Sequence, residues 1–342
     1  MASAAEGYGG ADVVEVSMSQ HSASLRRFAS PVASRCEVLA ELEPLVAQLT
    51  ERHLRKRKLW YPSELMPEPP LQELAALRER ARGLPDAVRV SLALNLLTEE
   101  GLPHFHRLIA TYLGQDSVWA KWNNLWTAEE DRHGCVLRDY VRDARLLNMP
   151  AFEQLQYQYL EAGFNPNWQG DPYRLLAYTS LQERATQVAH ANTGKLAGEH
   201  EPLLQTILAG IASDEARHYA FYREMFKALL QRDPNRALCA AAEVLPALSM
   251  PGQAIEGYGQ MAEVVHRTGI YGPRQYQTIV EDVLEFWGIA AMCGLHADGA
   301  RAQEMLLRLP RRLTRFADYV EQRASRKDFF FGFLYNRSLI CV

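Results

Sequence analysis

Two short segments each place a glutamate three residues before a histidine. The first pair is Glu130 and His133, and the second is Glu215 and His218. On a helix, residues three apart point the same way, so each pair offers one carboxylate and one imidazole to a common point. Both pairs are therefore candidate metal ligands.

Each pair also has a lone glutamate upstream at nearly the same distance. Glu99 precedes Glu130 by 31 residues, and Glu183 precedes Glu215 by 32. That spacing suits one helix, a short turn and an antiparallel return, because about 15 residues per arm make roughly four turns. Two such hairpins give the ligand set of the ferritin-like di-iron and di-manganese bundles. Four carboxylates and two imidazoles suit two iron ions that change oxidation state. The predicted metal ligands are Glu99, Glu130, His133, Glu183, Glu215 and His218.

A third glutamate–histidine step serves as an internal comparison. Glu263 and His266 have the same spacing, but no glutamate lies at the hairpin distance before them. A single step of this kind arises easily by chance. We assign this one to an ordinary helix surface, so the prediction rests on the doubled pattern.

Charged residues next to the candidate ligands suggest supporting roles. Asp214 and Glu129 each stand one residue before a ligand, and each can accept the free N–H of a ligand histidine across the bundle. Arg132 and Arg217 lie in matching places and can balance the carboxylates, with a solvated face as the less favoured alternative. The sequence leaves two roles open for Glu100: it can support a ligand, or it can compete with Glu99 for the iron.

Helical patterns dominate the rest of the chain, and no strand pattern of any strength is present. Residues 88–97, continuing past Pro103 to 113, and residues 173–191 are apolar on more than one face, which is typical of buried central helices. Pro103 should interrupt its helix near Glu99. Carboxylates inside such helices cost several kcal/mol unless they are paired or bound to a metal. We predict an all-α fold, a ferritin-like four-helix bundle extended by additional helices.

Bulk composition narrows the class of protein. The 342 residues are 48% hydrophobic and 23% charged, which fits one globular domain over 31–342 after a flexible tail over 1–30. A net charge of -4 argues against a nucleic-acid binder. Five scattered cysteines without a paired motif indicate reduced thiols. No apolar run approaches the roughly 20 residues that span a bilayer. A cytoplasmic location is expected, with the plastid stroma as the alternative.

The residues around the candidate ligands resemble the soluble acyl-carrier-protein desaturases of plants and actinobacteria. The similar segments follow the order of that family and extend over most of the chain. They are residues 60–67, 98–103, 126–134, 178–186, 214–218 and 309–313.

This resemblance implies an enzyme that uses O2 and two electrons from ferredoxin to introduce a cis double bond into a saturated acyl chain on acyl carrier protein. It implies a homodimer with one di-iron site per subunit and a bent acyl cavity beside the iron. The six predicted ligands match the family's ligand positions. Thr186 matches a hydroxyl near the O2 site, and Trp60 and Asp214 match residues on the electron path to iron.

Some positions depart from the family's pattern. Asp131 and Tyr219 replace an asparagine and an acidic residue next to the ligand motifs. On the presumed cavity wall, Tyr112 stands where the family often has leucine and Leu175 where it often has glycine. These two bulky residues predict a shorter pocket that favours palmitoyl over stearoyl chains or moves the double bond.

The carrier protein is acidic, so its docking surface should be basic. One candidate comprises Arg52, Arg55, Lys56, Arg57 and Lys58, and the other the arginines between Arg308 and Arg315. A plain solvated face is the alternative for both. We expect His104, His106, His190 and His200 to be structural histidines.

The ligand pattern also fits other functions. A di-iron hydroxylase or N-oxygenase acting on a carrier-bound intermediate would use the same ligands. An iron-storage protein would need a shorter chain than this one, whose regular pattern continues well past Asp233. A catalytically silent family member is a third alternative, which the complete ligand set disfavours.

Overall fold

The computed structural model describes residues 32–68, 70–247, 251–322, 326–335 and 337–341. These residues form α1 (Val32–Lys56), α2 (Pro62–Leu65), α3 (Leu71–Arg82), α4 (Asp86–Glu99), α5 (Leu102–Leu113), α6 (Val118–Asp143), α7 (Met149–Ala162), α8 (Pro172–Ala197), α9 (Pro202–Arg232), α10 (Pro234–Val244), α11 (Tyr258–Arg267), α12 (Pro273–Phe286) and α13 (Ala297–Gln322), with strands β1 (Lys327–Phe331) and β2 (Arg337–Cys341). Among the described residues, short 3₁₀ turns lie at Leu245–Ala247, Pro251–Ala254, Ile289–Ala291 and Gly332–Leu334. The predicted tail over 1–30 lies outside the described residues.

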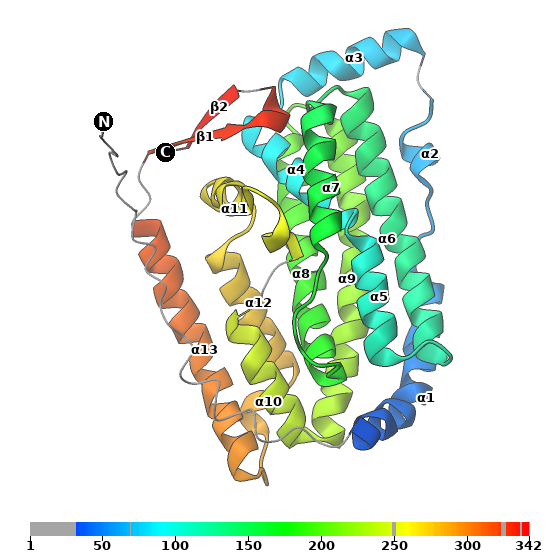
Figure 1. Ribbon diagram of the computed structural model, residues 1–342, viewed down its shortest axis with the longest axis vertical. Helices are drawn as coiled ribbons and strands as arrows, with labels where there is room; N and C mark the ends of the chain where they lie inside the picture. Colours follow the sequence, from blue (N-terminus) through cyan, green and yellow to red (C-terminus); the bar gives the residue numbers. More distant parts are fainter. Residues whose placement is uncertain (1–31, 69, 248–250, 323–325, 336, 342) are drawn as a thin grey trace, which may run out of the picture.

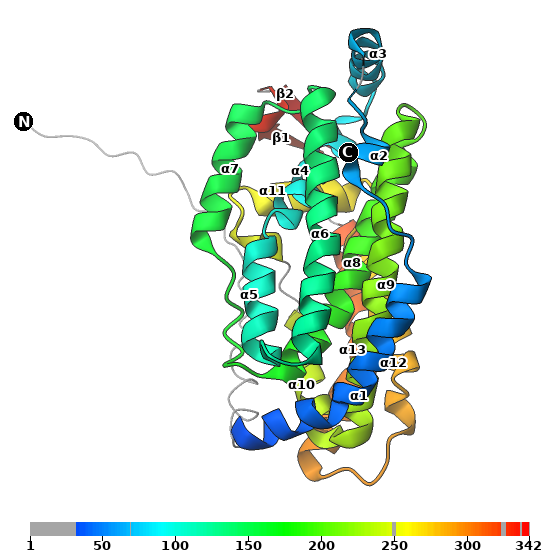
Figure 2. The same cartoon turned by 90° about the vertical axis from the view of Figure 1, so that its right-hand side faces the viewer.

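Helices α4, α6, α8 and α9 form the central bundle (Figure 1). Helices α10, α12 and α13 pack on one side of it, and α1 runs across α6 and α9 (Figure 2). The predicted class, an all-α bundle extended by further helices, is confirmed. Among the described helices, none is long and apolar enough to cross a membrane.

The α8–α9 hairpin shows why the chain folds back where the spacing predicted. Each helix starts at an acidic N-cap followed by proline: Asp171 accepts from the Tyr173 amide at 3.0 Å, and Glu201 accepts from the Leu203 amide at 3.1 Å. These caps satisfy backbone donors that a helix start leaves free, and proline suits the first turn. The two long helices then lie antiparallel and carry Glu183 and Glu215 into the bundle centre.

The predicted interruption before Pro103 is present. Helix α4 ends at Glu99, and the chain resumes as α5 at Leu102. Gly101 lies in the break, where an added Cβ would come 2.5 Å from the Tyr159 hydroxyl oxygen, so only glycine fits there. The break ends the buried helix at Glu99 and lets the next helix leave the core.

Helix α5 corrects one expectation from the sequence. Helix α4 is buried on almost every side, as predicted, but α5 buries only the face formed by Phe105, Ile109 and Leu113. These residues are four apart, so α5 is an amphipathic cover helix rather than a central one.

A β-hairpin near the C-terminus was not predicted. β1 pairs antiparallel with β2, with Phe329 opposite Leu339. Phe329, Phe331 and Phe333 are buried, and the Phe333 carbonyl accepts from the Asn148 amide at 2.8 Å. Only two side chains of β1 alternate inward, which is too short a pattern to separate from a helix segment.

Candidate metal centre

The six predicted ligands meet in the middle of the central bundle, and all of them are buried. They form two overlapping groups, in each of which one donor atom per residue lies within 4.8 Å of the others. Two carboxylates belong to both groups, as expected where two ions share bridging ligands. The groups are Glu99, Glu130, His133 and Glu215, and Glu130, Glu183, Glu215 and His218.

Each shared carboxylate presents one oxygen to each histidine. Glu130 places Oε2 3.3 Å from Nδ1 of His133 and Oε1 2.8 Å from Nδ1 of His218. Glu215 places Oε1 3.6 Å from the first Nδ1 and Oε2 3.5 Å from the second. Both carboxylates therefore point at two separate positions along the bundle.

Several donor atoms of this cluster form no hydrogen bond in the described part of the chain, although Oε1 of Glu130 and Nδ1 of His218 approach to 2.8 Å as an ion pair. They are Nδ1 of His133 and His218, Oε1 of Glu130 and Glu183, and Oε2 of Glu215. Buried polar atoms in folded proteins nearly always have partners, so convergent orphans need a common explanation. Two divalent cations would give each orphan a partner and would neutralise four carboxylates. The residues present fit such a pair of ions.

The pKa values of the clustered carboxylates also indicate a site that needs added positive charge. Burial, together with the neighbouring carboxylates, raises the pKa of Glu99 to about 7. Burial, joined by the charge of Glu215, raises the pKa of Glu183 well above its usual range. Burial also acts to raise the pKa of Glu130, but the two ligand imidazoles outweigh it and lower that pKa. The protein alone holds more acidic groups here than its imidazoles can balance.

Asp214 supports His133 from across the bundle, as the sequence suggested. Its Oδ2 lies 3.3 Å from Nε2 of His133 and accepts from Nε1 of Trp60 at 2.8 Å and from Nη2 of Arg132 at 3.4 Å. Arg217 pairs with the other oxygen. Burial acts to raise the pKa of Asp214, but His133 and Arg217 lower it. Trp60 thus contacts the support of His133 directly, and its ring stacks on that imidazole at 6.2 Å between centroids.

Glu129 contacts His218 from across the bundle, as Asp214 contacts His133. Its Oε2 lies 2.9 Å from Nε2 of His218 and 2.8 Å from Nε2 of His53, while Arg57 donates to its Oε1 at 3.1 Å. Burial acts to raise the pKa of Glu129, but the hydrogen bonds from His218 and His53 outweigh it and lower the pKa. The sequence did not single out His53, because it is one histidine in α1, 76 residues before Glu129 and outside any motif. Arg57, expected at a docking surface, is instead tied to this carboxylate.

His190 also contacts a candidate ligand, contrary to the expectation that it is only structural. Its Nε2 lies 2.9 Å from Oε1 of Glu99, and Nδ2 of Asn95 lies 3.3 Å from its Nδ1. The sequence held a usable signal, because His190 follows Glu183 by seven residues, two helical turns, and so shares its face.

Other residues singled out from the sequence lie apart from the cluster. Glu100 turns away and pairs with Arg138, at 2.5 Å between Oε1 and Nε. His104 bonds the Leu160 carbonyl at 3.0 Å and His106 bonds the Thr127 hydroxyl at 2.8 Å, as structural histidines do, whereas His200 is exposed. In the comparison pair, Glu263 forms ion pairs with Arg267 and Lys327. The two residues that depart from the family's pattern next to the ligand motifs also lie outside the cluster: Asp131 is exposed, and the ring of Tyr219 lies beneath Arg184 and Arg223.

Three residues predicted near the reaction site lie in α8, which carries Glu183, and in α5. Thr186 is half-buried one turn beyond Glu183, and its hydroxyl donates to the Glu183 carbonyl at 3.0 Å. Tyr112 of α5 is half-buried and Leu175 of α8 is fully buried. Leu175 belongs to a hydrophobic core cluster that also contains Trp122 and Trp126 of α6, and Tyr112 packs against this cluster.

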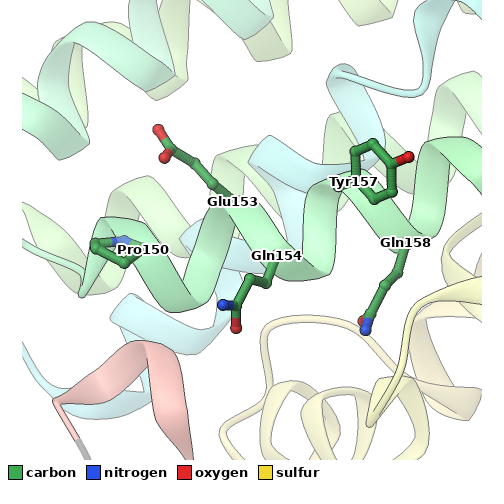
Figure 3. Close-up of a pocket in the computed structure, with 5 residues that line it drawn as sticks. All are labelled: Pro150, Glu153, Gln154, Tyr157 and Gln158. Carbon is green, nitrogen blue, oxygen red and sulfur yellow. The ribbon is translucent and has the colours of Figure 1, made fainter.

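A separate pocket of about 390 Å³ lies on the outer face of α7 (Figure 3). All the side chains that line it come from this one helix, and none belongs to the acidic cluster. They are Pro150, Glu153, Gln154, Tyr157 and Gln158. This pocket is therefore separate from the buried cluster of candidate ligands.

Comparison with known proteins assigns the family. The sequence profile described as fatty acid desaturase matches residues 34–333. The chain belongs to the fatty acid desaturase family. The resemblance read from the motifs is confirmed.

Curated members of this desaturase family resemble the chain over most of its length. It is 33% identical over 310 residues to the chloroplastic stearoyl-[acyl-carrier-protein] 9-desaturase of Gossypium hirsutum, covering 85% of this chain and 78% of that protein. It is 34% identical over 283 residues to the putative acyl-[acyl-carrier-protein] desaturase DesA1 of Mycobacterium tuberculosis, covering 79% and 83%. The crystal structure of the putative acyl-ACP desaturase DesA2 from Mycobacterium tuberculosis H37Rv shares the fold, with a TM-score of 0.57 and 24% identity over 74% of this chain and 96% of that one.

Proposed function

We propose that this family member is an acyl-[acyl-carrier-protein] desaturase with two iron ions per chain. One observation carries the proposal: two overlapping glutamate and histidine groups share Glu130 and Glu215 in the buried centre of the bundle. The names of the curated relatives supply the substrate, a fatty acyl chain on acyl carrier protein.

The proposed reaction removes one hydrogen from each of two adjacent methylene carbons. O2, two electrons and two protons are consumed, and two waters and a cis alkene form. The iron ions, when bound, supply the redox chemistry that joins O2 reduction to C–H cleavage. The protein holds those ions and the carbon pair in fixed positions.

Asp214 and Glu129 set which nitrogen of each ligand histidine is free. Each carboxylate accepts a hydrogen bond from the Nε2–H of one histidine. The Nδ1 atoms of His133 and His218 therefore keep their lone pairs for the metal. The support is crossed, because Asp214 of α9 holds a histidine of α6 and Glu129 of α6 holds a histidine of α9. Each half of the site thereby fixes the other.

Ferredoxin is the proposed electron donor. Trp60, Asp214 and His133 form a hydrogen-bonded line into the cluster, with links of 2.8 Å and 3.3 Å. Trp60 is buried in the connection between α1 and α2, but its neighbours Leu59 and Tyr61 are exposed, so an external donor protein can approach this segment. This line gives electrons a bonded route through the protein to the metal pair.

The acyl chain is proposed to lie in the hydrophobic region below the cluster, where Tyr112 and Leu175 shorten its path. A dry environment of this kind excludes water from the reacting carbons and fixes their position. Thr186, one turn beyond Glu183, is proposed to supply the hydroxyl near the site where O2 reacts.

The carrier protein is proposed to dock on α13. Arg311, Arg312 and Arg315 are exposed, and none of them forms an ion pair within the described residues. In the other basic segment, by contrast, Arg52, Arg55 and Arg57 already pair with glutamates. Unpaired arginines suit an acidic partner better, because no internal pair must be broken first. A homodimer and a cytoplasmic location complete the proposal.

The test is to incubate the iron-loaded protein with palmitoyl- and stearoyl-carrier protein, O2 and a ferredoxin reducing system, and to weigh the released fatty acids by mass spectrometry. A loss of two hydrogens is expected, and Glu130→Ala should abolish it. A gain of one oxygen would reassign the chain to the hydroxylases, and an unchanged acyl chain despite bound iron would contradict the proposal.

A further inference from the structure

We propose that His53 is a positioning residue for one of the two iron ions, acting through Glu129 on His218. The inference rests on the proposed two-iron centre and concerns how one half of it is held. No ligand motif contains His53, which reaches the centre from α1, outside the central bundle.

Contact geometry makes His53 part of the support. Oε2 of Glu129 receives two imidazoles, with Nε2 of His53 at 2.8 Å and Nε2 of His218 at 2.9 Å. The two rings are stacked at 5.7 Å between centroids, with 16° between their planes. Trp122 meets the edge of both rings. His53 is 6% exposed, so this arrangement is enclosed by the fold.

The shared oxygen fixes the roles of the two rings. A carboxylate only accepts, so both Nε2 atoms must carry hydrogen. His218 then has its Nδ1 lone pair free, on the side that faces Glu130 and Glu215. Holding Glu129 in place therefore keeps His218 in the tautomer and orientation that bind a metal.

In the other half of the site, no histidine of the described residues apart from the ligand His133 contacts the supporting carboxylate Asp214. Asp214, which supports His133, is held by Trp60, Arg132 and Arg217, and none of these is an imidazole. Arg132 also lies 4.0 Å from Oε1 of Glu129, at the far limit of an ion pair, but His53 itself contacts Glu129 and not Asp214. Loss of His53 should therefore act mainly on the ion at His218. The structure assigns a one-sided role, and this makes the inference testable.

The variant His53→Phe keeps an aromatic ring of similar shape but removes the donor to Glu129. Anaerobic Fe(II) titration against a competing chelator should show two ions bound by the wild-type protein. In His53→Phe, one ion should bind about 10-fold more weakly, the lower end of the range for partners that touch a ligand, because His53 acts one contact further out, and the other should bind as before. His53→Gln, which restores an amide donor, should recover most of the lost affinity.

A double-mutant comparison identifies the affected ion. In a His133→Ala background, the remaining ion lies at His218, and His53→Phe should weaken it by the same factor. In a His218→Ala background, His53→Phe should change nothing. The matched control is Trp60→Phe, which removes the donor to Asp214 and should give the opposite pattern. Equal weakening of both ions, or an effect that persists in the His218→Ala background, would overturn the proposal.

Two further readouts keep the result interpretable. A cooperative thermal unfolding transition in each variant shows that the bundle has formed, and His53→Leu, which also lacks a donor to Glu129, serves if His53→Phe does not fold. Binding of two ions by the wild-type protein, with no change in His53→Phe, would contradict the role of His53 and leave the proposed function intact. A wild-type protein that binds no metal would instead overturn the proposed function, and this inference with it.

Discussion

Glu99 and His190 meet across the α4–α8 interface, with Oε1 of the carboxylate 2.9 Å from Nε2 of the imidazole. The other oxygen of Glu99 lies 3.9 Å from Nδ1 of His133, inside the cluster. Because Glu99 is the last residue of α4, its backbone lies at a helix break, and His190 is the contact that fixes its side chain. The end of a helix is thereby made rigid enough to hold a ligand.

Replacement of His190 by phenylalanine should weaken metal binding. The change removes the donor to Glu99, so the carboxylate can rotate away from the ion at His133, and its affinity should fall about tenfold or more. Equilibrium Fe(II) binding measures the effect. His104→Phe is the control, because it also deletes a half-buried imidazole hydrogen bond but touches no candidate ligand. Equal affinities in wild type and His190→Phe would refute the role of this contact.

Shared and unshared carboxylates should respond differently to truncation. Glu183 belongs to one ligand group only, so Glu183→Ala should lose one ion and keep the other. Glu130 belongs to both groups, so Glu130→Ala should weaken both ions. The number of metal ions per chain after gel filtration, measured by elemental analysis, separates the two cases. Retention of one tight ion in Glu130→Ala, or loss of both in Glu183→Ala, would show that the two groups do not overlap as described.

The pattern of ligands could be predicted from the sequence, because helical geometry converts a spacing of three residues into a shared direction. The supporting roles of Glu129 and Asp214 could also be predicted, because each residue directly precedes a ligand in the sequence. His53 could not be predicted, because α1 crosses the bundle at an angle that only tertiary packing sets. His190 could have been predicted by the same spacing argument, because it follows Glu183 by seven residues on the same helix face.

The fold outside the bundle was less predictable. Residues 102–113 looked apolar on several sides, yet α5 buries only one face because the break at Gly101 turns it outward. The hairpin of β1 and β2 depends on contacts with α4 and α7, such as the ion pair of Arg337 with Asp86 at 3.0 Å. Local sequence carries little of that information.

Cavity-wall substitutions should change chain-length preference. Tyr112→Leu and Leu175→Gly each remove bulk from the core cluster where the acyl chain is proposed to lie. The double variant should shift turnover from palmitoyl toward stearoyl substrates, or move the double bond along the chain. Competition between the two carrier-bound substrates, with products separated by gas chromatography, measures the shift. An unchanged preference would remove these residues from the cavity.

Charge reversal on α13 should weaken carrier binding without harming the chemical step. Substituting Arg311, Arg312 and Arg315 by glutamate should raise KM for the carrier-bound substrate severalfold, and added salt should raise the wild-type KM in the same direction because it screens these charges. The comparison variant carries Lys56→Glu and Lys58→Glu on the other basic segment. If that variant raises KM and the α13 variant does not, docking belongs to the α1 segment instead.

The central claim is that six buried side chains hold two ions that share Glu130 and Glu215. Anomalous diffraction at the iron absorption edge, from crystals of the iron-loaded protein, tests it most directly. The account predicts two peaks, one among Glu99, Glu130, His133 and Glu215 and the other among Glu130, Glu183, Glu215 and His218. A single peak, or a peak between His53 and Glu129, would contradict it.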